Sequence, residues 1–159
     1  MAEIRGQLRA IGRIAIFVSQ YNERVTSRLL DGALDCCRAA NLAESDVDVV
    51  WLPGAFELGG AAAAAAMTGR YAAIVGLGCV VRGETAHFEF VAGEAARGLS
   101  TVATTHGLPV AFGVLTTETM EQSLARAGGE AGNKGYEAAE AAIRTADALA
   151  QLRGMHAAH

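Results

Sequence analysis

The sequence predicts an α/β fold of three layers, in which helices cover both faces of a four-stranded parallel sheet. Apolar, β-branched runs alternate with stretches of helical periodicity along the 159 residues, and such alternation is typical of βαβ units. Each apolar run is hydrophobic almost throughout, as expected of a parallel strand buried on both faces. The length suits one domain over residues 1–159.

Four segments have the composition of buried strands and are bounded by turn residues or charges. Right-handed crossovers restrict the order in which such strands can pair, and we expect the flavodoxin-like order 2-1-3-4. The predicted strands are Arg13–Val18, Val47–Leu52, Ala72–Leu77 and Pro109–Leu115.

Helical segments are expected between and after these strands. Apolar residues recur along Glu23–Ala40 at the spacing of one helix face, and Leu58–Met67 consists mostly of alanine, the best helix former. Further helices are expected at Thr85–Thr104, Met120–Ala127 and Tyr136–Leu152.

The two ends of the chain are expected to lie outside this core. Residues 1–11 are predicted to form an N-terminal arm, whose segment Ile4–Ile11 pairs with a neighbouring copy of the chain. Residues 154–159 are predicted to form a frayed tail.

Composition excludes several classes of partner. The net charge of -4 and the pI near 5.5 argue against nucleic acid, which needs a basic face. The longest apolar stretch, Tyr71–Val81, is too short to span a membrane.

The three cysteines have neither zinc-site nor disulfide spacing; they are Cys36, Cys37 and Cys79. Reduced thiols therefore predict a cytoplasmic protein.

Polar and aromatic residues gather after the predicted strands. Ligands of such sheets bind outside the carboxyl ends of the strands. Tyr21 follows the first strand and could stack on a flat heteroaromatic ring or be a surface aromatic. Glu57 follows the second strand and could accept hydrogen bonds from a polyol or simply favour a helix N-terminus. A mostly apolar pocket with a few polar groups suits a small molecule.

An anion site is predicted after the third strand. Gly83-Glu84-Thr85 is expected to open a helix, whose unpaired N–H groups could hold phosphate or carboxylate. Arg126 or Lys134 could neutralise that anion, although an ordinary helix cap would also explain the pattern. His87 could transfer protons near neutral pH or lie idle on the surface.

Motifs for cofactors are incomplete. The glycines at 76 and 78 lack the rest of a dinucleotide fingerprint, and no P-loop or zinc-deaminase signature is complete. We therefore expect neither a cofactor nor a metal.

Taken together, several ordered motifs resemble the lumazine synthase family. The resemblance covers about residues 11–145 with plausible spacing throughout. The motifs that carry it are Pro53–Leu58, Gly78–Val91, Phe112–Thr117, Glu121-Gln122, Arg126–Gly128 and Gly132–Gly135.

The resemblance implies an enzyme of riboflavin biosynthesis with the flavodoxin-like fold. Such enzymes condense 5-amino-6-(D-ribitylamino)uracil with 3,4-dihydroxy-2-butanone 4-phosphate. The products are 6,7-dimethyl-8-ribityllumazine, phosphate and water, and no cofactor takes part.

The resemblance also assigns substrate-binding residues. The aromatic at position 21 would stack on the pyrimidine, residues 55–57 would bind the ribityl chain, and residues 79–81 would line the pyrimidine edge. The implied set for this substrate is Tyr21, Ala55, Phe56, Glu57, Cys79, Val80, Val81 and, from a neighbouring subunit, Phe112.

The phosphate-binding and catalytic positions follow from the same resemblance. Glu84 and Thr85 would bind the phosphate together with Arg126 of a neighbouring subunit, and His87 would transfer protons. Tyr21 stands where phenylalanine or tryptophan is usual, and Glu84 places an acid beside the phosphate. Gly59-Gly60 replaces the usual apolar-proline continuation, which predicts a looser helix start.

An oligomer is implied as well. The family forms homopentamers, and in some members twelve pentamers build an icosahedral shell of sixty subunits. The loop Gly128–Gly135 resembles the shell-forming type. The resemblance also implies association with riboflavin synthase. Alternatives are a flavin or lumazine carrier, a mainly structural shell protein, or another phosphosugar enzyme on the same fold.

Overall fold

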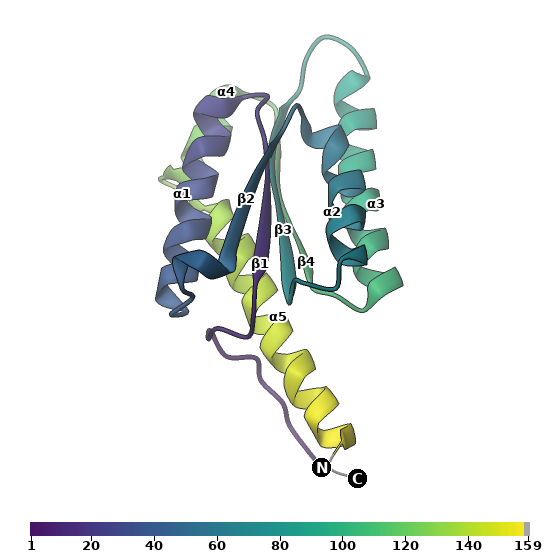
Figure 1. Ribbon diagram of the computed structural model, residues 1–159. Coiled ribbons are helices and arrows are strands. Elements are labelled where there is room, and N and C mark those ends of the chain that lie inside the picture. The colour runs from purple at the N-terminus through teal and green to yellow at the C-terminus, as the bar shows by residue number, and fades with distance from the viewer. Residues whose placement is uncertain (158–159) are drawn as a thin grey trace.

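Helices cover both faces of a central sheet in the computed structural model, which describes residues 1–157 (Figure 1). The helices α1 (Glu23–Ala39) and α5 (Lys134–Ala157) pack together on one face. The helices α2 (Leu58–Met67) and α3 (His87–His106) pack on the other. The predicted three-layer α/β fold is confirmed.

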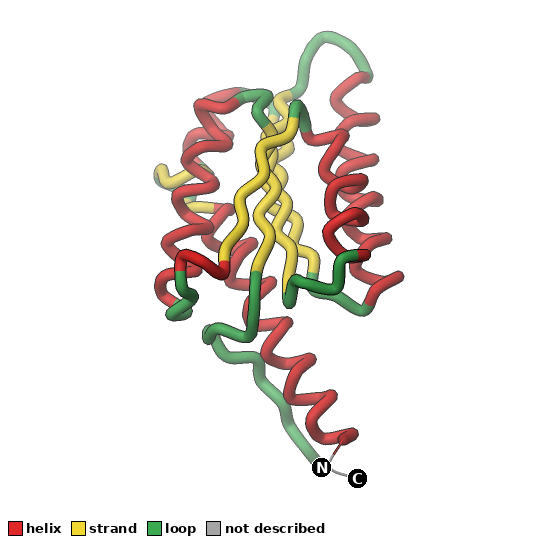
Figure 2. Tube along the Cα trace, viewed as in Figure 1, coloured by secondary structure: helices red, strands yellow, loops and turns green. Residues whose placement is uncertain are grey.

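The sheet has four parallel strands in the order β2-β1-β3-β4, as predicted (Figure 2). Its strands are β1 (Ile14–Ser19), β2 (Val47–Leu52), β3 (Ala73–Val81) and β4 (Val110–Thr117).

The strands end at different heights. The pairing of β1 with β3 stops at Val18 opposite Leu77. Beside β4, however, β3 continues until Val81 lies opposite Thr117. The sequence predicted an end at Leu77, but β3 is four residues longer because β4 keeps pairing with it. A step therefore forms at the carboxyl edge of the sheet, next to β1.

Alternating side chains of the central strand build two hydrophobic layers. Ile14, Ile16 and Val18 pack with α1 and α5, whereas Ala15 and Phe17 face the layer of α2 and α3. This alternation follows from the two-residue period of a strand, and it buries β1 on both faces.

Short elements connect these parts. The predicted helix Met120–Ala127 ends earlier, because α4 (Met120–Ala125) is followed by a small hairpin of β5 (Ala127–Gly129) and β6 (Gly132–Asn133). The hairpin was not predicted. Two 3₁₀ turns, η1 (Glu44–Asp46) and η2 (Ala55–Glu57), precede β2 and α2 respectively.

The last helix is longer than the sequence indicated. It begins at Lys134 and continues to Ala157, whereas the prediction ended near Leu152 with a frayed tail from 154. Backbone of residues 154–157 is helical, and residues 158–159 of the expected tail lie outside the described residues. No helix in the described part of the chain is long and apolar enough to cross a membrane.

The N-terminal arm lies along the end of α5 of its own chain (Figure 1). The buried Asp147 carboxylate accepts hydrogen bonds from the Gln7 backbone N–H at 2.7 Å and the Arg9 Nε at 2.6 Å. Gln151 Nε2 donates to the same carboxylate at 2.8 Å. The arm is thus fixed to α5 by one buried anion.

Candidate functional site

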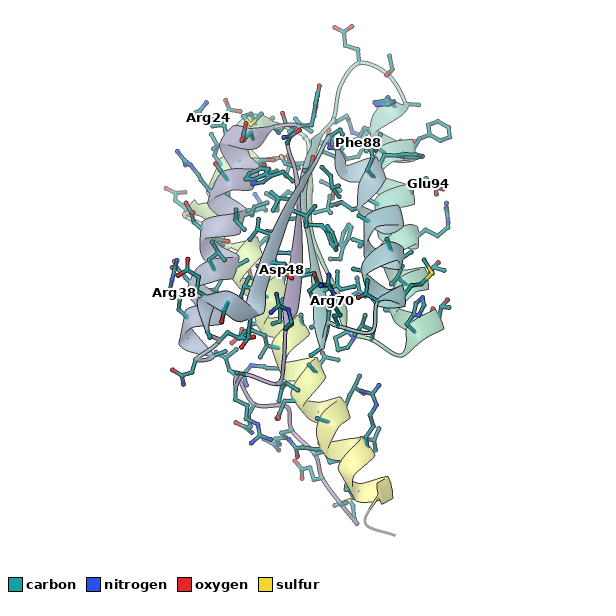
Figure 3. The ribbon with its side chains drawn as sticks, in the orientation of Figure 1. Arg24, Arg38, Asp48, Arg70, Phe88 and Glu94 are labelled. Atoms are coloured by element: carbon teal, nitrogen blue, oxygen red, sulfur yellow. The ribbon has the colours of Figure 1, made fainter. Side chains whose placement is uncertain are left out.

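A cleft of about 690 Å³ opens at the carboxyl edge of the sheet. Its size and mainly apolar lining suit a small organic ligand. Figure 3 shows Phe88, one of its lining residues, near this end of the sheet, while Asp48 and Arg70 lie nearer the opposite end. The lining residues are Ser19, Tyr21, Pro53, Gly54, Ala55, Phe56, Glu57, Cys79, Val80, Val81, Gly83, Thr85, His87, Phe88, Phe90 and Val91.

Tyr21 is held in the cleft by its backbone. The Gln20 N–H donates to Leu52 O at 2.7 Å and the Tyr21 N–H to Pro53 O at 3.1 Å, which ties the end of β1 to the loop after β2. The Tyr21 side chain is 72% exposed. Its ring is therefore open to stack on a ligand, and its hydroxyl needs no buried partner.

The loop after β2 forms a second wall. Gly54 has extended backbone and is followed by the 3₁₀ turn η2, in which the Glu57 N–H donates to Gly54 O at 3.3 Å. The turn buries Ala55 beneath the cleft and leaves Phe56 and Glu57 exposed beside it. An apolar ring and a carboxylate that can accept several hydrogen bonds thus lie next to each other.

The end of β3 supplies an apolar floor. Cys79 is buried, and its Sγ donates to the Ser123 hydroxyl at 3.2 Å. Burial raises the pKa of the Cys79 thiol above its usual value. The thiol therefore stays neutral and serves as lining rather than as a nucleophile.

The helix that follows begins later than predicted. α3 starts at His87 rather than at Thr85, so the N-terminus of the helix lies at His87 and not at Gly83–Thr85. Thr85 instead accepts a hydrogen bond from the His87 N–H at 3.4 Å through its Oγ1. Thr85 and His87 both line the cleft, but Glu84 does not.

Arg82 braces this helix start, a role that the sequence did not indicate. Its guanidinium lies 4.6 Å from the centroid of the Phe88 ring, a cation–π contact. It also forms ion pairs with Glu118 at 3.0 Å and Glu89 at 3.5 Å. Arg82 thereby links Phe88 and Glu89, which follow His87, to Glu118 just after the end of β4.

Two predicted site residues lie away from the cleft of their own chain. Phe112 is on the edge strand β4 and is 46% exposed. Arg126 follows α4, where its Nη1 donates to Gln122 O at 3.0 Å. Neither lines the cleft, and within residues 1–157 no lysine or arginine does. A phosphate bound here would need a cation from another molecule.

Several lining residues were not singled out from the sequence. Phe90 and Val91 follow His87 by three and four residues, so they share one face of α3 with it. That helical spacing was the available signal. Ser19 directly follows the predicted first strand, and that strand-end position was its signal. Within residues 1–157 no cluster of potential ligand side chains could hold a metal ion.

Comparisons with known proteins agree on one family. The profile of the 6,7-dimethyl-8-ribityllumazine synthase family matches residues 12–150. A 6,7-dimethyl-8-ribityllumazine synthase from Yersinia pestis (strain Pestoides F) is 49% identical over 143 residues. The match covers 89% of this chain and 92% of the relative. The enzyme of the same name from Yersinia pseudotuberculosis (strain YPIII) matches with the same identity and coverage.

Proposed function

The chain belongs to the 6,7-dimethyl-8-ribityllumazine synthase family, and we propose that the cleft at the carboxyl edge of its sheet is the active site. The protein is an enzyme of riboflavin biosynthesis. It condenses 5-amino-6-(D-ribitylamino)uracil with 3,4-dihydroxy-2-butanone 4-phosphate to give 6,7-dimethyl-8-ribityllumazine, phosphate and water. The observation that carries the site proposal is that most of the residues expected to bind these substrates line one cleft.

The pyrimidine substrate fits the side of the cleft nearest β1. The exposed Tyr21 ring stacks on the flat heterocycle, and Val80 and Val81 border its edge. Glu57 accepts hydrogen bonds from the ribityl hydroxyls beside Ala55 and Phe56. The mixture of apolar and hydrogen-bonding surface supports this placement.

The phosphate substrate fits the opposite side, where α3 begins. Thr85 offers its hydroxyl there, and the dipole at the start of α3 favours negative charge. We assign Glu84 to this subsite through its backbone, because its side chain does not line the cleft. Arg126 of a neighbouring subunit supplies the missing cation.

The proton transfers are assigned to His87, which lines the same cleft. The 5-amine of the uracil attacks the carbonyl of the butanone, and one water is lost as a Schiff base forms. Phosphate is then eliminated, and the ribityl-bearing nitrogen attacks the remaining carbonyl carbon and closes the second ring with loss of a second water. Each step moves a proton, and imidazole can donate or accept one near neutral pH. Much of the acceleration then comes from holding both substrates together.

We further propose that the active site is completed between subunits of a homopentamer. Phe112 and Arg126 are absent from the cleft of their own chain but are available to a neighbour. An isolated monomer would therefore be inactive. Twelve pentamers would form a shell through the Gly128–Gly135 loop, and sedimentation that finds only pentamers across buffers would reject the shell.

Riboflavin synthase, which would consume the product, is the proposed protein partner. The proposed location is the cytoplasm, because all three cysteines are unpaired, and a reducing compartment maintains free thiols.

The direct test mixes the purified protein with both substrates and follows the absorbance or fluorescence of the lumazine. Turnover is expected. A carrier would bind the pyrimidine or the lumazine without turnover, and a purely structural shell protein would bind neither.

Mixed oligomers test the shared site. In an equal, random mixture of His87→Ala and Arg126→Ala subunits, about a quarter of the sites would draw an intact His87 and an intact Arg126 from different chains. Activity of the reassembled mixture is therefore expected to exceed the mean of the two parents. Activity no higher than that mean would show that both residues act within one subunit.

A further inference from the structure

Asn22 adopts an unusual backbone conformation beside the cleft. Its φ of 61° and ψ of 44° place it in the left-handed region, which asparagine tolerates better than most residues. Among the described residues other than glycine, only Asn41 also has a positive φ, again 61°. Asn41 is exposed and lies beyond the far end of α1, away from the cleft.

The side chain of Asn22 bridges the step in the sheet. The strand β1 stops pairing with β3 at Leu77, so the following part of β3 has no strand beside it on the β1 side. Asn22 Nδ2 donates to the backbone carbonyl of Cys79 at 2.9 Å. The amide therefore takes the place of a strand partner where β3 forms the cleft floor.

The backbone of Asn22 holds the same loop from the other direction. Its carbonyl accepts hydrogen bonds from the N–H groups of Val25 at 2.9 Å and Thr26 at 3.0 Å, which begin α1. The Thr26 hydroxyl donates to Ser19 O at 2.7 Å. The loop that carries Tyr21 is thus closed at both of its ends.

We propose that Asn22 is a positioning residue for the pyrimidine subsite. Through its hydrogen bond to Cys79 it sets the gap between the Tyr21 ring and the edge formed by residues 79–81. The side chain of Asn22 is not itself part of the cleft lining. This inference rests on the proposed function, since it names a support for the site at which the uracil binds.

The test compares two variants with matched backbone effects. Asn22→Gly and Asn41→Gly both place glycine at φ 61°, but only the first removes the bridge to Cys79. A hydrogen bond of ordinary strength predicts that Asn22→Gly raises KM for the uracil substrate by about tenfold. KM for the butanone phosphate is expected to change less than about twofold, as the loss is confined to one subsite. Asn41→Gly is expected to leave both unchanged.

A second variant guards against simple unfolding. Asn22→Asp keeps the side-chain size and tolerance for this backbone, but it directs a carboxylate oxygen at the Cys79 carbonyl. Asn22→Asp is expected to raise KM for the uracil substrate at least as much as Asn22→Gly does. If both variants fail to assemble while Asn41→Gly assembles, Asn22 serves folding and the proposal is overturned.

Direct binding separates this inference from the proposed function. The affinity for 6,7-dimethyl-8-ribityllumazine, measured by fluorescence titration, should fall for the two Asn22 variants and not for Asn41→Gly. Equal affinities, or equal rises in KM for both substrates, would overturn the positioning role while wild-type turnover upheld the function. If the wild-type protein bound the lumazine without turnover, the proposed enzymatic function would be wrong. The lumazine affinities of the variants would still test the positioning role of Asn22. If the wild-type protein bound no lumazine, both the proposed function and the positioning role of Asn22 would be wrong.

Discussion

His87 is the residue on which the proposed chemistry depends most directly, and the structure places it at the first position of α3. Its backbone N–H is held by Thr85, and its helix start is braced by Arg82 through Phe88 and Glu89. The imidazole is exposed at the mouth of the cleft, where water can replace it as a proton carrier.

His87→Ala is therefore expected to slow turnover without abolishing it. Loss of a general acid–base group lowers kcat by about 100-fold, while the juxtaposition of two bound substrates still accelerates the reaction. Steady-state assays with each substrate varied in turn would measure this. Arg126→Ala is the comparison, because it removes the proposed phosphate contact. If His87→Ala lost activity as completely as Arg126→Ala, a merely assisting role would be wrong.

The structure explains two departures from the usual family pattern, at Tyr21 and Glu84. A buried tyrosine hydroxyl would need a hydrogen-bond partner, but Tyr21 is exposed and its hydroxyl can bond to water. A carboxylate at Glu84 repels a bound phosphate if it points toward it. Its side chain does not line the cleft, which is compatible with binding through the backbone.

At the scale of elements, the pair of glycines at the start of α2 is explained by the packing of α2 on α3. A Cβ built on Gly59 would lie 2.9 Å from the Gly98 Cα, closer than real Cβ contacts allow. A Cβ on Gly60 would meet nothing within 4 Å. The looser helix start that the sequence predicted is therefore explained by Gly60. Gly59 instead allows α2 and α3 to pack in direct contact.

Alanine at these two positions should have opposite effects. Gly59→Ala forces the helix backbones apart and is expected to lower the free energy of unfolding by about 1–3 kcal/mol. Gly60→Ala is the matched control and is expected to raise it by up to about 1 kcal/mol, because alanine favours the helix. Urea denaturation of both variants in the same assembly state measures the difference. Equal effects would mean that the contact between α2 and α3 relaxes freely.

At the scale of the whole molecule, one buried carboxylate joins the first and last parts of the chain. The pKa of Asp147 is lowered, chiefly by the hydrogen bond from the Gln7 N–H, with further contributions from Arg9 and Gln151, against the opposing effect of burial. A carboxyl whose pKa is lower in the folded state stabilises that state above its unfolded pKa. This contribution is lost as the pH falls through the folded pKa.

The arm is therefore expected to be released by acid or by neutralising Asp147. Hydrogen–deuterium exchange of residues 1–11, corrected for the intrinsic effect of pH, should lose protection as the pH falls below about 3.8, the ordinary pKa of an aspartate. Asp147→Asn should lose it already at pH 7. Asp35→Asn is the control, since Asp35 is exposed and pairs with Arg38 rather than with the arm. Unchanged protection in Asp147→Asn would indicate another hold on the arm, such as the predicted pairing with a neighbouring subunit.

Local patterns in the sequence were enough to predict the fold class, the strand order and most of the residues at the strand ends. These follow from local patterns: apolar runs for β1 to β4, helical periodicity between them, and right-handed crossovers that limit the topology. Because the carboxyl ends of parallel strands meet at one edge, the residues after β1, β2 and β3 were expected together there. Their motifs also indicated the family to which the chain belongs.

The lengths of the strands and helices, and the set of side chains that reach the cleft, depend on contacts between distant parts of the chain. The extra length of β3 depends on pairing with β4, the close approach at Gly59 depends on α3, and the hydrogen bond of Asn22 depends on Cys79. None of these is encoded in local propensity, since each partner lies far along the chain. Phe112 lies within β4 and Arg126 follows α4, and neither reaches the cleft of its own chain.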